Sequence, residues 1–101
     1  MDIAVFQGLM KSLFFHRDEA RGITGTFTWL VEEVGELARE IRKIDTEDPS
    51  RQERLKHEFA DVFAWLCSVA NLAGVDMDRA VREKYPNNCL KCGGNPCSCQ
   101  T

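Results

Sequence analysis

Two segments of the chain carry the same pattern of acidic and apolar residues. The first reads WLVEEVGEL over residues 29–37, and the second reads LKHEFADV over residues 55–62. Aligned on Leu30 and Leu55, both follow the pattern L-x-x-E-x-x-[ED]-[LV]. Four carboxylates occupy the matching positions: Glu33, Glu36, Glu58 and Asp61. A spacing of three residues places both acids of a pair on the same side of a helix.

These acids favour metal-ion chemistry at phosphorus. If the apolar faces of the two helices pack together, four carboxylates converge, and their repulsion raises their pKa values or requires a cation. Oxygen-only ligands suit Mg²⁺ or Mn²⁺ better than Zn²⁺. A magnesium site of this kind leaves coordination positions for water and for substrate phosphates. The pattern therefore predicts a nucleotide or another polyphosphate as ligand, with hydrolysis as the reaction.

A solvated helix face is the alternative interpretation of the same acids. Glutamate favours helices, and charged runs are common on their exposed sides. The local pairing weakens this alternative, because Glu33 and Glu58 are followed four residues later by apolar residues rather than by cations. Only Glu36 has a near partner, Arg39.

Helices are the elements that must position these acids. Apolar residues recur every three or four positions between breakers, which predicts four helices. Their expected ranges are 2–20, from about 24–28 to 43, 50–73, and from about 76–78 to 85. Gly22 and Gly74 are expected to end helices, threonines to cap the second, Asp76 or Asp78 to cap the fourth, and Pro86 to stop it. Between the second and third helices lies a polar loop over 45–50. The fold class is all-α, an up-and-down helical bundle.

Length and composition limit the remaining possibilities. A chain of 101 residues forms one domain, and its small size favours a homo-oligomer that completes the bundle. A net charge of −3 argues against binding to nucleic acid. The sequence contains no apolar stretch long enough to cross a membrane and no signal-peptide pattern, so we expect a cytoplasmic protein.

The acidic motifs have a family resemblance. Glu32-Glu33-x-x-Glu36 followed by Glu58-x-x-Asp61 resembles the EExxE…ExxD signature of the MazG-like nucleotide pyrophosphohydrolases, within the all-α NTP pyrophosphatase superfamily. The resemblance extends over roughly residues 3–88, with GVD at 74–76 and KYP at 84–86 also fitting. We accordingly expect a MazG-like domain over residues 1–88 and a separate tail over 89–101.

The resemblance implies an activity and a set of ligands. Members of the family hydrolyse nucleoside triphosphates, often deoxy or non-standard ones, to monophosphate and pyrophosphate. Glu33, Glu36, Glu58 and Asp61 would hold the Mg²⁺ ion, which Mn²⁺ could replace. Members are dimers or tetramers whose pockets include helices of neighbouring chains. A substrate such as dUTP or phosphoribosyl-ATP stays open, as does a dCTP-like one.

Substrate contacts follow from the resemblance and from residue chemistry. The positions of Lys84 and Asn88 after Asp61 resemble those of a lysine and an asparagine that bind phosphate and base in deoxycytidine-specific members. The alternatives are a cation at a helix C-terminus and a turn residue. Trp29 and Trp65 could stack on a base, or they could be core or interface aromatics.

Four cysteines lie close together near the C-terminus. Cys89, Cys92, Cys97 and Cys99 fall within 11 residues, among glycines and a proline. Such spacing favours a structural Zn²⁺ ion, with free thiols or disulfides as alternatives. Cys67, in the third helix, is expected in the core. A non-catalytic helical adaptor, with a solvated acidic face and a zinc knob that binds a partner, is the competing function.

Overall fold

The protein is described from a computed structural model that covers residues 1–45 and 47–100. Four α-helices follow one another: α1 (Ile3–Arg21), α2 (Ile23–Arg42), α3 (Arg51–Ala73) and α4 (Met77–Lys84). These described residues contain no β-strand, which confirms the all-α class. Residue 46 of the predicted loop and residue 101 of the predicted tail lie outside the described residues.

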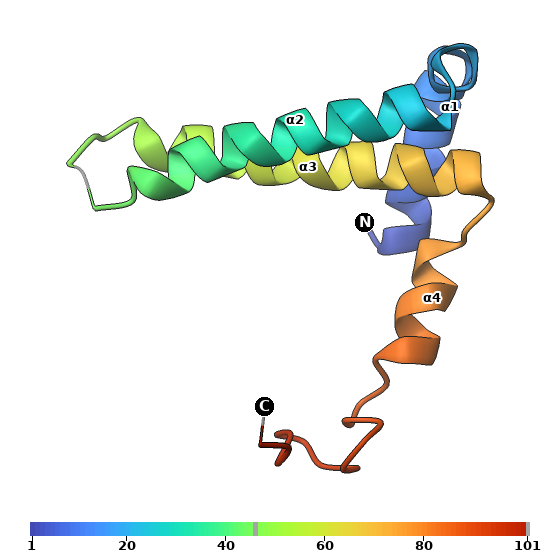
Figure 1. Ribbon diagram of the computed structural model, residues 1–101, viewed down its shortest axis with the longest axis vertical. Coiled ribbons are helices and arrows are strands. Elements are labelled where there is room, and N and C mark those ends of the chain that lie inside the picture. Colours follow the sequence, from blue (N-terminus) through green and yellow to red (C-terminus); the bar gives the residue numbers. More distant parts are fainter. Residues whose placement is uncertain (46, 101) are drawn as a thin grey trace.

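Helices α2 and α3 form the centre of the molecule (Figure 1). They run antiparallel over most of their length, and α1 crosses the end of this pair where α2 begins and α3 ends. Helix α4 leads away from the pair and carries the C-terminal tail with it. The two acid-bearing segments therefore lie side by side on α2 and α3.

The helix boundaries follow local chemistry. Asp2 caps α1 by accepting a hydrogen bond from the backbone N–H of Val5 at 2.8 Å, and Asp76 caps α4 in the same way with Arg79 at 3.1 Å. Gly74 ends α3 in the left-handed conformation, with φ of +71°.

The prediction that threonines cap α2 is wrong. Gly22, with φ of +88°, lets the chain turn from α1 directly into α2, so the helix begins at Ile23, before the threonines. Thr26 and Thr28 lie inside the helix and donate to the carbonyls four residues earlier, at 2.8 and 2.9 Å.

A buried glutamine fixes the corner where α3 turns into α4. Gln7 of α1 donates from Nε2 to Asn71 Oδ1 at 3.0 Å and to the Val75 carbonyl at 2.8 Å. Its Oε1 accepts from the backbone N–H of Met77 at 2.9 Å. This side chain satisfies backbone groups at the corner, so it holds the start of α4 against α1.

The buried core of a single chain is small. Its hydrophobic members are Met10, Leu30, Leu55, Cys67 and Ala70, so Cys67 is a core residue as predicted. Many other large apolar side chains stay exposed on the three long helices: Val5, Leu9, Leu13, Phe27, Val31, Val34, Ile41, Phe59, Phe63 and Leu66. The predicted apolar faces are therefore only partly covered within one chain.

Within the described part of the chain, no single helix is both long and apolar enough to span a bilayer. Helices α3 and α4 together have the length and composition for it, but they are sharply bent relative to each other.

Candidate active site

Three of the predicted acids converge between α2 and α3. Glu33 comes from α2, and Glu58 and Asp61 come from α3. One carboxylate oxygen from each residue lies within 4.8 Å of the other two. Glu33 and Glu58 are half-buried, whereas Asp61 is exposed. We refer to these three residues as the acidic cluster.

The acidic cluster is electrostatically unfavourable without a cation. Burial raises the pKa of Glu33, and the charges of Asp61 and Glu58 raise it further. The pKa of Glu58 is raised by burial and then by the charge of Asp61. Glu58 Oε2 is also buried and has no hydrogen-bond partner. An oxygen ligand set of this kind fits a hard divalent ion, which would supply both the missing charge and the missing partner.

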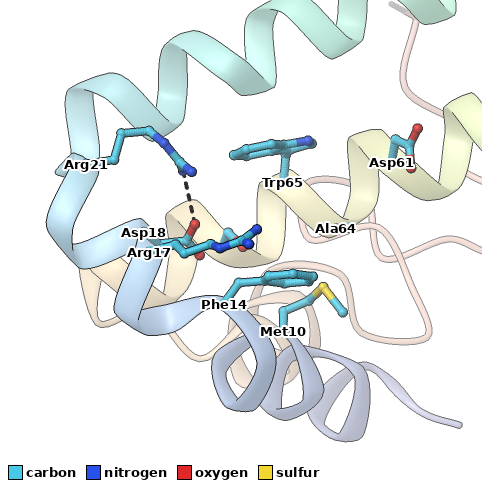
Figure 2. A pocket seen from close by; sticks show the side chains of 9 residues that line it. Met10, Phe14, Arg17, Asp18, Arg21, Asp61, Ala64 and Trp65 are labelled. Carbon is cyan, nitrogen blue, oxygen red and sulfur yellow. Dashed lines mark hydrogen bonds and ion pairs between the residues drawn. The ribbon is translucent and has the colours of Figure 1, made fainter.

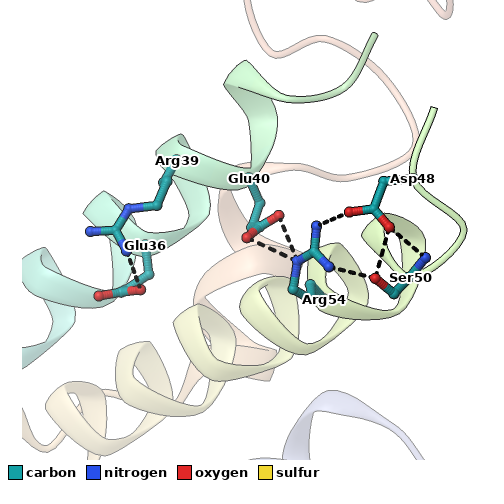
Figure 3. Close-up of polar contacts among 6 residues, drawn as sticks. All are labelled: Glu36, Arg39, Glu40, Asp48, Ser50 and Arg54. Carbon is teal, nitrogen blue, oxygen red and sulfur yellow. Dashed lines mark hydrogen bonds and ion pairs between the residues drawn. The ribbon is translucent and has the colours of Figure 1, made fainter. Parts of the chain in front are cut away.

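Glu36 lies at the edge of the acidic cluster rather than within it. Its carboxylate forms an ion pair with Arg39 at 3.8 Å, as the sequence suggested, and about half of its side chain is exposed (Figure 3). Its charge nevertheless contributes to the raised pKa values of Glu33 and Glu58. The structure thus brings together three of the four predicted acids. Glu36 lies one helical turn from Glu33, at the edge of the cluster.

A second group of acids lies further along the same helix pair. Arg54 of α3 donates from Nε to both carboxylate oxygens of Glu40 at 3.3 Å and from Nη2 to Asp48 at 2.8 Å (Figure 3). Hydrogen bonds from Arg54 and Ser50 lower the pKa of Asp48 to about 2. We call Glu40, Asp48 and Arg54 the paired cluster. Arg54 follows Glu40 by 14 residues, so no local spacing rule identified the pair.

The two tryptophans lie against each other across the helix pair. Trp29 and Trp65 are stacked, with ring centroids 6.0 Å apart and planes inclined by 14°. The guanidinium carbon of Arg21 lies 5.1 Å from the Trp65 ring centroid. Trp29 keeps 46% of its surface exposed. Such a pair provides an aromatic surface beside the acidic cluster.

A cavity of about 220 Å³ opens between α1 and α3, next to the acidic cluster (Figure 2). Asp61 belongs both to the cluster and to the cavity lining. The other lining residues are Met10, Phe14, Arg17, Asp18, Arg21, Ala64, Trp65 and Ser68. Sequence reasoning did not find the charged members of α1. The spacing of Asp18 and Arg21 predicts an ion pair, which forms at 3.1 Å, but nothing in the pattern predicted that Asp18 would be buried.

Lys84 and Asn88 lie in a different part of the molecule. Both are exposed and line an open groove between the end of α4 and the cysteine tail. Helix α4 points away from the α2–α3 pair in Figure 1, so these two residues do not line the cavity beside the acids. Their contact with substrate stays a prediction.

The four tail cysteines form a compact group. Their sulfur atoms all lie within 4.8 Å of one another, with 3.8 Å between Cys89 and Cys99 and 3.9 Å between Cys92 and Cys97. The backbone N–H groups of Gly94 and Ser98 donate to Cys92 Sγ at 3.4 and 3.3 Å. Hydrogen bonds from Ser98, followed by the one from Gly94, lower the pKa of Cys92 to about 5, so the thiolate is favoured there.

Fold and site together define a class: all-α proteins in which an antiparallel helix pair presents convergent carboxylates beside a cavity. Within that class, a family model, the MazG nucleotide pyrophosphohydrolase domain, matches residues 21–91, and the chain belongs to this family. The match confirms the resemblance seen in the acidic motifs and supports a nucleotide pyrophosphohydrolase in general. The search of curated proteins found no match.

Proposed function

We propose that the protein is a Mg²⁺-dependent nucleoside triphosphate pyrophosphohydrolase, which converts (deoxy)NTPs to monophosphate and pyrophosphate and so clears unwanted nucleotides. The convergence of Glu33, Glu58 and Asp61 is the observation that carries the proposal. Membership of the MazG family supports it. The half-buried positions of Glu33 and Glu58 and the raised pKa values of these two residues favour a divalent cation over a solvated acidic face.

In this proposal the three carboxylates hold Mg²⁺, or Mn²⁺ in its place. Glu36 adds negative charge from the edge of the site and becomes a fourth ligand if its pairing with Arg39 opens. When bound, the ion neutralises phosphate charge and activates water for attack at phosphorus. Helices α2 and α3 fix the ligands before substrate binds, because each acid projects from a continuous helix.

The base is expected to lie on the aromatic side of the site. The Trp65 ring lines the cavity that Asp61 also borders, so a nucleotide can place its base in the cavity and its phosphates towards the acids. Trp29 supports Trp65 from α2. The substrate is a dCTP-like or non-standard nucleotide in this proposal.

A homodimer or homotetramer is part of the proposal. The many exposed large apolar side chains on α1, α2 and α3 support it, since a neighbouring copy would remove them from water. A neighbouring copy would also explain how Lys84 and Asn88 serve a site that their own chain does not bring them to.

The experiment is a product assay with each NTP and dNTP plus Mg²⁺, separating pyrophosphate from orthophosphate. Monophosphate plus pyrophosphate, lost in Glu58→Gln but kept in the matched surface variant Glu53→Gln, is the expected result. Absence of hydrolysis with both Mg²⁺ and Mn²⁺ across the nucleotides would contradict the proposal and favour the adaptor.

We also propose that the tail holds a structural Zn²⁺ ion on Cys89, Cys92, Cys97 and Cys99. A tetrahedral site with Zn–S bonds of about 2.3 Å places its sulfurs about 3.8 Å apart. The sulfur–sulfur distances of 3.8 and 3.9 Å match this value and are far too long for disulfides. Zinc would fix the irregular tail at the end of α4.

Elemental analysis of the purified protein tests the zinc proposal. One zinc per chain is expected, with loss in Cys92→Ser and retention in Cys67→Ala, which removes a core thiol instead. A metal-free protein whose mass reveals two disulfides would overturn it.

A further inference from the structure

The Arg21 side chain is held in one orientation at the junction of α1 and α2. Its Nη1 donates to Asp18 Oδ1 at 3.1 Å and to Thr26 Oγ1 at 3.3 Å. The Asp18 side chain is 4% exposed and Thr26 is fully buried, so neither acceptor can move far from its place in the packed interior. Two anchored acceptors on one nitrogen therefore restrict where the guanidinium can lie.

Gly25 leaves the room that this orientation needs. Glycine is less favourable than alanine inside a helix, because it loses more conformational freedom on folding. Gly25 lies inside α2 and its φ is not positive, so the backbone does not require glycine there. A Cβ atom at this position would lie 2.8 Å from Arg21 Cγ and 3.4 Å from Arg21 Cδ. The missing side chain thus lets the stem of Arg21 pack directly against α2.

The far end of Arg21 lies against Trp65 of α3. The guanidinium carbon is 5.1 Å from the ring centroid, which is within the range of a cation–π contact. Trp29 provides the second contact, as a nearly parallel ring. Stacked aromatic pairs accept a broad range of offsets, so Trp29 alone lets the Trp65 ring slide. In Figure 2 the Arg21 guanidinium lies beside this ring, and Phe14 lies across the cavity from it.

We propose that Arg21 is a positioning residue, which fixes the Trp65 ring in the cavity wall where the base of the nucleotide stacks. The inference rests on the proposed function, in which the base lies against Trp65 and the phosphates lie towards Asp61. A base stacks well only on a ring whose plane and offset match its own. Trp65 follows Asp61 by one helical turn on α3, so a shift of the ring also moves the base relative to the acids. Arg21 acts through Trp65 and does not itself touch the nucleotide.

Two variants and a matched control test this role. Gly25→Ala keeps every charged group and favours the helix, but its Cβ displaces the stem of Arg21. Gly8→Ala is the control, because it makes the same change inside α1, where the added methyl group meets open space. Arg21→Gln removes the guanidinium itself. Since it leaves Asp18 buried without its partner, Gly25→Ala decides alone if the Arg21→Gln variant does not fold.

Near-UV circular dichroism measures the positioning without a substrate. Trp29 and Trp65 are the two tryptophans of the chain, so the tryptophan bands report on this pair. Weaker bands with a wild-type far-UV spectrum are expected in Gly25→Ala and Arg21→Gln, because near-UV bands depend on fixed side-chain packing. Gly8→Ala should keep the wild-type bands. Wild-type tryptophan bands in Gly25→Ala would overturn the inference.

Steady-state kinetics with dCTP and Mg²⁺ show whether the base uses this position. Gly25→Ala and Arg21→Gln are expected to raise KM by about 5- to 30-fold and to leave kcat within about twofold, because stacking stabilises substrate and transition state alike. Loss of folded protein would instead lower kcat at an unchanged KM. In a Trp65→Ala background, Gly25→Ala should raise KM no further, since Arg21 acts through Trp65. An unchanged KM in Gly25→Ala, or a second rise in that background, would overturn the inference.

Failure of the proposed function gives a different result. If the wild-type protein hydrolyses no nucleotide, the proposed function fails, and calorimetry with dCMP replaces KM. Weaker binding of dCMP by Gly25→Ala than by Gly8→Ala, together with weaker near-UV bands, supports the inference. Equal binding by the two variants, or no binding by the wild-type protein, overturns it.

Discussion

The helix pair α2–α3 carries two groups of carboxylates with opposite electrostatic character. In the paired cluster, Arg54 lies between Glu40 and Asp48, and the pKa of Asp48 falls to about 2. In the acidic cluster, three carboxylates lie together, and the pKa values of Glu33 and Glu58 rise. One group contains its own cation, whereas in the other like charges lie together, as the proposed metal site requires.

This difference separates acids whose charge the chain itself neutralises from acids whose charges lie together, and the proposed function assigns the metal to the second group. Glu40 comes from α2 like Glu33, Asp48 precedes α3, and both groups consist of aspartate and glutamate, so composition alone does not distinguish them. The direction of the pKa shift distinguishes the two groups, because a partner of opposite charge lowers a carboxyl pKa, whereas burial and like charges raise it. Four variants break or sharpen the comparison.

The largest effect is expected from Glu58→Gln in the acidic cluster. Losing a ligand whose Oε2 is buried and unpartnered should lower kcat/KM on the order of 10²–10³-fold, since metal stabilisation of the transition state amounts to several kcal/mol. Asp48→Asn in the paired cluster should keep activity close to wild type. Steady-state kinetics with excess Mg²⁺ measures both variants. Equal losses of kcat/KM in Glu58→Gln and Asp48→Asn would remove the distinction between the two clusters.

Metal affinity should show the next largest effect. Glu33→Gln is expected to weaken Mg²⁺ or Mn²⁺ binding by at least about tenfold, because it removes one of three convergent oxygens. Asp48→Asn should bind the ion as the wild-type protein does, since Arg54 already satisfies that carboxylate. Isothermal titration calorimetry on metal-free protein gives the constants. Wild-type affinity in Glu33→Gln would exclude Glu33 as a ligand.

Removing the internal cation should convert the paired cluster into a repulsive one. Arg54→Gln leaves Glu40 and Asp48 without their partner, so the Tm at neutral pH should fall by about 4 °C. The wild-type Asp48 pKa lies below its ordinary value of 3.8, so its contribution to stability is present above that pH and lost as the pH falls towards 2. Thermal melts between pH 2 and 5 should therefore show a shallower pH dependence in Arg54→Gln. An unchanged profile would refute the role given to Arg54.

The smallest effect is a gain in stability. Because the pKa of Glu33 is raised in the folded state, the metal-free protein loses stability as the pH rises through that raised value. Glu33→Gln removes this repulsion and should raise the Tm of the metal-free protein at pH 7 by about 2 °C. This increase is smaller than the Tm shift that 1 kcal/mol causes in a domain of this size. Mg²⁺ should raise the wild-type Tm more than it raises the Tm of the variant. A lower Tm in metal-free Glu33→Gln would show that the carboxylate stabilises the fold.

Local rules placed most of the helices but not every boundary. Apolar spacing predicted the number of helices, and Gly74 and Asp76 ended and began them as expected. The start of α2 was missed because Gly22 at positive φ joins α1 to α2 without a loop, and no spacing rule distinguishes that junction from a helix that ends there. The arrangement of α1 across the end of α2–α3 depends on Gln7 and its contacts with residues 64 to 70 positions away.

The sequence by itself determined the four helices, the acids at matching positions of two of them and the compact spacing of the tail cysteines, because helical periodicity and ligand spacing are local properties. Tertiary structure alone decided which acids converge, that Arg54 neutralises Glu40 and Asp48, and that Asp18 is buried in a cavity. Convergence and burial depend on how distant helices pack, and no local spacing specifies that packing.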